Sequence, residues 1–182
     1  MPKQVVDAWQ KELRTWLAQQ DFELAIAERP EWESAIPLRL RKQYRKLKRQ
    51  GWLNRLDECH GDCVLRQPEL SMLVAKTLLH FEGDRYDTDC LVVMPNHVHL
   101  IVQFRSGTSL AKQTRSWLQY SAREVNQRLG RQGKFWQSEP FDHLIRSEEQ
   151  FHYLRRYIAE NPEKAGLGVG EYLYWNRVEG FQ

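Results

Sequence analysis

The sequence predicts an α+β protein in which a β-hairpin and amphipathic helices follow a basic helical region. Three observations lead to this prediction. Apolar residues recur at helical spacing in several segments. Two apolar runs, 90–94 and 97–104, flank a Pro95-Asn96 turn signal, which is typical of a β-hairpin. Seven Lys and Arg residues crowd positions 39–49.

Length and composition fit a protein with one active domain and a small appended region. The 182 residues are 41% hydrophobic and 28% charged, which is typical of a globular chain. No apolar stretch approaches the ~18 residues of a membrane span, and the N-terminus lacks the apolar core of a signal peptide. We therefore expect a cytoplasmic protein with no membrane partner. The three cysteines predict reduced thiols, with Cys90 in the core.

The first part of the chain is predicted to be helical and basic. Apolar stripes predict helices over Val5–Gln20 and Leu38–Gln50, the second ending before Gly51. We place an N-terminal extension at 1–62 and the catalytic domain at 63–182. The run of cations in the second helix would attract phosphate groups, so nucleic acid is the expected partner. The candidate contacts are Arg41, Lys42, Arg45 and Lys46.

Three more helices are predicted around the hairpin. Pro68 opens a helix over Glu69–Phe81, and Gly130 closes a longer one over Ser109–Leu129. The last begins at Ser147, whose side chain can cap Gln150, and runs to a break at Pro162.

His97 and His99 are the strongest functional signal. In a strand, residues i and i+2 share a face about 6.6 Å apart, so both imidazoles could reach one metal ion. The alternative is two histidines that share a strand face without binding anything. Cys59 and Cys63 resemble half of a zinc site, but the other half is absent and a loop is the favoured interpretation.

Tyr157 and Asn161 lie one turn apart on the flank of the last predicted helix. They could supply a phenolic nucleophile and a third metal ligand. They could equally be a half-buried tyrosine and a helix-capping asparagine. Tyr120 is a rival nucleophile, because it lies off the apolar stripe of its own helix among basic residues.

Several blocks of the sequence resemble the REP-associated tyrosine transposases, a branch of the single-tyrosine HUH nucleases. The resemblance covers roughly residues 60 to 170, with the blocks in matching order and spacing. They are Val93-Met94-Pro95-Asn96-His97-Val98-His99, Phe135-Trp136-Gln137, Phe141-Asp142-His143-Leu144-Ile145-Arg146 and the run from Tyr157-Ile158-Ala159-Glu160-Asn161-Pro162 to Leu167.

The resemblance implies a ferredoxin-like antiparallel sheet with packed helices. It also implies that His97, His99 and Asn161 hold Mg²⁺ or Mn²⁺ while Tyr157 attacks single-stranded or hairpin DNA. The product would be a 5′-phosphotyrosine with a free 3′-OH. From their position beside Tyr157, Arg155 and Arg156 are candidate phosphate contacts, and the alternative is two solvated arginines. Tyr157 is preferred to Tyr120 because the family places its nucleophile in this block.

This chain differs from the resembling family at its start. Relatives usually begin with an aromatic and threonine-rich strand, whereas this sequence opens with a helix, so the first sheet strand is expected to be missing. That departure keeps open the alternative of a DNA-binding protein without turnover. A second alternative is a metal-dependent hydrolytic nuclease that uses activated water, with Tyr157 only structural. A homodimer is also left open.

Overall fold

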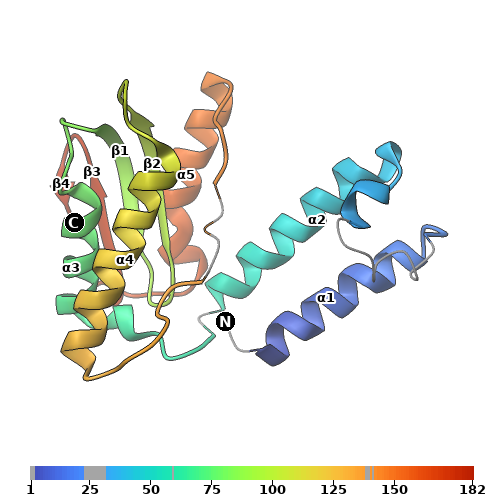
Figure 1. Cartoon of the computed structure of the whole chain (residues 1–182), viewed down its shortest axis with the longest axis horizontal. Coiled ribbons are helices and arrows are strands. Elements are labelled where there is room, and N and C mark those ends of the chain that lie inside the picture. The colour runs from blue at the N-terminus through green and yellow to red at the C-terminus, as the bar shows by residue number, and fades with distance from the viewer. Residues whose placement is uncertain (1–2, 23–31, 59, 138–139, 141) are drawn as a thin grey trace. The chain divides into compact units, whose positions relative to one another are not determined.

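The computed structural model describes residues 3–22, 32–58, 60–137, 140 and 142–182 (Figure 1). The chain divides into two compact units, Met1–Gly61 and Asp62–Gln182.

The N-terminal unit pairs two long helices, α1 (Lys3–Ala18) and α2 (Leu38–Asp57), with a short 3-10 helix η2 (Trp32–Ala35). The apolar stripes of the two helices meet in one core, as their spacing predicts. Its buried members are Trp9, Leu13, Leu17, Phe22, Ile36, Leu40 and Tyr44.

The predicted end of α2 before Gly51 is wrong, because the helix continues to Asp57. A Cβ added at Gly51 would lie 2.8 Å from Trp9 Nε1. This glycine therefore permits a close approach between α1 and α2 rather than ending a helix.

The C-terminal unit contains an antiparallel sheet of β1 (Tyr86–Val93), β2 (Val98–Phe104), β3 (Leu173–Asn176) and β4 (Gly180–Phe181). Its order is β2-β1-β3-β4, and β1 pairs with β2 across the predicted hairpin. No strand precedes Tyr86 in the described part of the chain, and β2 is an edge strand. The α+β class is confirmed.

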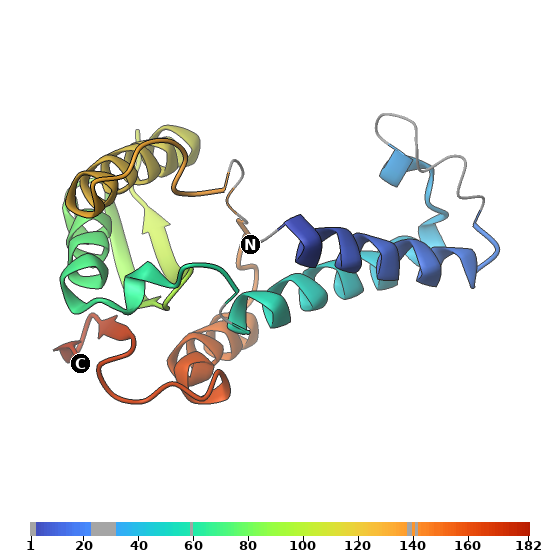
Figure 2. The ribbon, with the colours of Figure 1, turned by 90° about the horizontal axis from the view of Figure 1, so that it is seen from below.

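Helices cover both faces of this sheet (Figure 2). One face packs against α3 (Pro68–Leu79) and α4 (Leu110–Leu129), which follow the 3-10 helix η3 (Val64–Arg66). The other face packs against α5 (Glu148–Lys164). The predicted caps are present: Ser147 accepts the Gln150 N–H, and Gly130 has φ of 61° after α4. Ser109 also caps α4 by accepting the Lys112 N–H.

A β-bulge at Asp89 gives β1 two different halves. Thr88 pairs with Val102 and Cys90 with Ile101, which leaves Asp89 without a partner on β2. Tyr86 packs toward α3 and α4, whereas Cys90 and Val92 pack toward α5. Alternation along a regular strand would place these even-numbered residues on one face, so the extra residue switches the face.

The predicted break at Pro162 is wrong, because α5 continues to Lys164 with Pro162 inside it. A proline removes one N–H donor and crowds the carbonyl four residues earlier, and this one lies in the last turn of the helix. The Ala165 N–H still donates to Asn161 O at 3.0 Å, so the turn closes around it.

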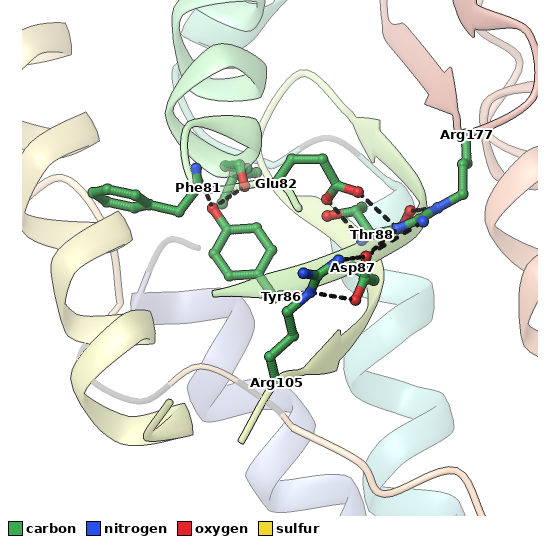
Figure 3. A network of polar contacts seen from close by, with 8 residues as sticks. Phe81, Glu82, Tyr86, Asp87, Thr88, Arg105 and Arg177 are labelled. Carbon is green, nitrogen blue, oxygen red and sulfur yellow. Dashed lines mark hydrogen bonds and ion pairs between the residues drawn. The ribbon is translucent and has the colours of Figure 1, made fainter. Parts of the chain in front are cut away.

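A polar network fastens the end of the chain to the start of β1 (Figure 3). The guanidinium of Arg177 donates to Glu82 Oε1 at 2.6 Å and to Thr88 O at 2.9 Å. Arg105 donates two hydrogen bonds of 2.8 Å to Asp87, which lower the pKa of that carboxyl. The turn after β3 is thereby tied to the strand on which the bulge lies.

Among the described residues, no helix combines the length and the apolar character that crossing a bilayer requires.

Candidate active site

The two histidines lie together on the α5 face of the sheet, at the hairpin end of β2. His97 is 6% exposed and stands in the turn, while His99 pairs with Val92 across the β1–β2 ladder. Their Nε2 atoms are 3.0 Å apart and their ring centroids 4.6 Å apart. The structure therefore brings both imidazoles to one point.

Asn96 fixes the tautomer of His97. Asn96 Oδ1 lies 2.7 Å from His97 Nδ1, and because an amide oxygen only accepts, the proton must be on Nδ1. His97 Nε2 then carries a lone pair directed toward His99. Such an orienting partner is typical of metal-binding histidines.

Both histidines are held in the neutral form. Burial, together with the neighbouring His99, lowers the pKa of His97 to about 2. Burial lowers the pKa of His99 to about 4. At neutral pH neither ring carries a charge that would repel a cation.

Tyr157 lies beside this pair on α5. Its ring centroid is 5.6 Å from that of His99, at an interplanar angle of 70°. Asn161 follows one turn later and is fully buried, while Ile158 packs into the core beneath.

The two imidazole nitrogens are spaced like neighbouring ligands of an octahedral cation. Two ligands about 2.1 Å from one ion and at right angles to each other are about 3.0 Å apart. That is the separation of the two Nε2 atoms, 3.0 Å. The described residues contain no cluster of three or more His, Cys, Asp or Glu side chains that could hold a metal ion. A site here would use the Asn161 amide beside the two imidazoles.

Arg155 and Arg156 have different surroundings. Arg155 Nε lies 3.1 Å from Asp89 Oδ2, so its charge faces the bulge of β1. Arg156 is exposed on the outer side of α5. Sequence reasoning missed Asp89 and Asn96, because a bulge residue and a turn residue have no distinctive spacing.

Tyr120 lies on the other side of the sheet. It belongs to α4, whose Trp117 and Val125 pack against the sheet face opposite to α5. The Tyr120 side chain is 50% exposed. The structure does not bring it to the histidines.

The candidate DNA contacts on α2 differ in their surroundings. Arg41 donates to Ser34 O at 2.7 Å and to Ile36 O at 3.0 Å, so it closes the turn before its own helix. An exposed stripe at spacing i, i+3, i+4 and i+7 follows, consisting of Lys42, Arg45, Lys46 and Arg49.

Two features of the sequence lie partly outside the described residues. These are Cys59 of the half zinc pattern and Phe141 of the resembling block 141–146. Cys90 is buried in the core beside α5, as predicted, and burial raises the pKa of its thiol to about 12.

Comparison with known families gives one match. Residues 75–161 match the family described as "Transposase IS200 like". Neither the curated proteins nor the solved structures gave a match. The matched segment contains the hairpin with both histidines, all of α4, and α5 as far as Asn161. Residues 75–161 therefore form a segment similar to the IS200-like transposases.

Proposed function

We propose that this protein cleaves and rejoins single-stranded DNA, using Tyr157 as the nucleophile and a divalent cation held by His97, His99 and Asn161. The observation that carries the proposal is the convergence of the two Nε2 atoms, 3.0 Å apart, beside the Tyr157 ring. Hairpin-forming repeats are the proposed substrate. Mg²⁺ and Mn²⁺ are the proposed ions, because both take octahedral coordination.

The reaction is a transesterification. Tyr157 Oη attacks the phosphorus of the scissile phosphodiester and loses its proton, and the 3′-oxygen leaves as a free 3′-OH. A bound cation would withdraw electron density from the phosphate and stabilise the charge that develops on it. The protein–DNA bond is itself a phosphodiester, so attack by another 3′-OH releases Tyr157 and joins strands without external energy.

The fold positions the Tyr157 phenol relative to the two histidines. Rigid packing of α5 on the sheet holds the phenol near the histidines, which replaces a bimolecular encounter with a fixed arrangement. Asn96 directs the His97 lone pair. The placement of Tyr120 on the opposite sheet face supports Tyr157 as the nucleophile.

The test is covalent capture of labelled hairpin DNA in Mn²⁺, followed by denaturing electrophoresis. Wild-type protein should give a slow protein-linked band. Tyr157→Phe should abolish this band and retain DNA binding, because only the hydroxyl is removed. Tyr153→Phe is the matched control, since Tyr153 lies on the same helix with its side chain 64% exposed.

Other outcomes would contradict the proposal. Cleaved ends without a protein-linked band would indicate hydrolysis by activated water. An adduct that survives Tyr157→Phe and disappears in Tyr120→Phe would transfer the nucleophile to α4. Binding without adduct in either ion would indicate a DNA-binding protein without turnover.

A further inference from the structure

The outer face of α4 is a surface that the proposed reaction does not use. Its side chains are exposed, whereas the buried residues of α4, among them Trp117 and Val125, pack toward the sheet. We call this surface the α4 platform, and its residues are Lys112, Arg115, Ser116, Gln119, Tyr120 and Arg123.

The α4 platform has positive charge without acidic side chains. Lys112, Arg115 and Arg123 are its charged members, and none of its residues is Asp or Glu. Among the described residues, Lys112 and Arg115 form no ion pair within 4.0 Å. Glu124, which lies outside the platform, pairs with the platform residue Arg123 at 3.2 Å and with Arg128 at 3.3 Å. Such a surface is complementary to an anionic chain.

The tyrosine of this surface has no packing role in the core. Trp117, one turn earlier, packs against the sheet, is 6% exposed and donates to Tyr86 Oη at 3.1 Å. Tyr120 is half exposed, and the Arg123 guanidinium carbon lies 5.1 Å from its ring centroid. An open aromatic ring beside a guanidinium can accept a stacked base.

We infer that the α4 platform binds a single-stranded segment of DNA. A base stacks on Tyr120, while Lys112, Arg115 and Arg123 contact the flanking phosphates. The inference rests on the proposed function and deepens it. Because α4 and α5 cover opposite faces of the sheet, the platform holds a segment other than the scissile phosphate (Figure 2).

Single strands are favoured for a physical reason. In a duplex both faces of each base are already stacked, so a tyrosine ring has nothing to contact. In a single strand any base offers a free face, which makes the binding tolerant of sequence. Charge alone would not distinguish the two forms of DNA in this way.

Affinity measurements on the full chain test the inference. The probes are a dye-labelled single-stranded oligonucleotide and its duplex, both in EDTA so that no cleavage occurs. Tyr120→Ala should weaken single-strand binding about tenfold and leave duplex binding nearly unchanged. Tyr120→Phe should retain wild-type affinity, since it keeps the ring. Lys11→Ala is the control, because Lys11 is an exposed cation on α1, outside the platform.

The salt dependence of affinity tests the proposed phosphate contacts of the platform. Arg115→Gln should reduce the slope of log affinity against log salt by about 0.7 for single-stranded DNA. Photocrosslinking to iodouracil-containing DNA should map to the tryptic peptide Ser116–Arg123, in which Tyr120 is the exposed aromatic residue. The crosslink reports contact even if another surface dominates the affinity.

Three outcomes would overturn the inference. The first is an unchanged single-strand affinity in Tyr120→Ala together with no crosslink in the peptide Ser116–Arg123. The second is an equal loss of affinity for single strands and duplexes in Tyr120→Ala. The third is a change in the oligomeric mass of that variant without a change in its DNA affinity. The last would identify the face as a contact between copies. Failure of the proposed reaction is scored separately, as absence of the covalent adduct in wild-type protein.

Discussion

At the scale of single residues, the buried histidines make stability depend on pH. An unfolded histidine has a pKa of about 6.5. In the folded protein the pKa of His99 is about 4 and that of His97 about 2. Below about pH 6.5 the unfolded chain therefore binds protons that the folded chain does not. The stabilisation that comes from keeping both histidines neutral is complete above that pH. It is lost as the pH falls toward their pKa values in the folded protein.

We expect the free energy of unfolding to fall between about pH 6.5 and about pH 4, by up to about 1.4 kcal/mol per pH unit for each histidine. Urea titrations at several pH values check this. His99→Gln should remove part of the slope, whereas a substitution of the exposed His152 should leave it. A flat profile over this range would contradict the burial argument.

The histidine pair could be predicted from the sequence because its spacing and a strand together determine its geometry. The role of Asn96 could not. Asn at that position satisfies a turn equally well, and only the folded hairpin shows its Oδ1 beside His97 Nδ1. Whether Asn161 is a metal ligand stays a prediction.

At the scale of elements, the bulge in β1 and the helix α5 are joined by the Asp89–Arg155 ion pair. We expect Asp89→Asn to slow adduct formation at saturating DNA by about tenfold or more, because the helix that carries Tyr157 loses an anchor and small displacements are costly. DNA affinity should stay unchanged. Glu148→Gln, which alters an exposed carboxylate on α5, is the control.

Single-turnover rates and binding curves together decide between two roles for Arg155. If Arg155→Ala lowers DNA affinity and Asp89→Asn does not slow the reaction, then Arg155 contacts phosphate, as the sequence alone predicts. A slower reaction at full affinity, partly restored by Arg155→Lys, makes it a positioning residue.

The helices were predictable because apolar periodicity persists over several turns. β3 and β4 were missed because they have only four and two residues, although the aromatic run Tyr172-Leu173-Tyr174-Trp175 was a usable signal. Gly51 and Pro162 were misjudged for a shared reason. Local rules predict that both residues end a helix. In the structure, Gly51 lies inside α2 and allows the contact with Trp9, and Pro162 lies in the last turn of α5.

At the scale of the whole molecule, the exposed stripe of α2 predicts salt-sensitive DNA binding. Like charges at i and i+4 destabilise a helix, so their concentration here suggests a role beyond folding. Replacing Lys42, Arg45 and Lys46 by Gln should reduce the slope of log affinity against log salt by about 2 to 3.

Fluorescence anisotropy across a salt series measures this slope. Lys48→Gln is the matched control, because Lys48 belongs to the same helix but pairs with Glu33. An unchanged slope in the triple variant would remove α2 from the DNA-binding surface. The assignment of 1–62 and 63–182 as functional domains stays a prediction that this comparison addresses.

The bulge at Asp89 also determines what kind of genetic change β1 tolerates. Loss of one codon there would restore regular alternation and rotate half of the strand by about 180°. Either Tyr86 would leave the layer beneath α3 and α4, or Cys90 and Val92 would turn away from α5. A point substitution changes one side chain, whereas this deletion would exchange the two buried faces along half of the central strand.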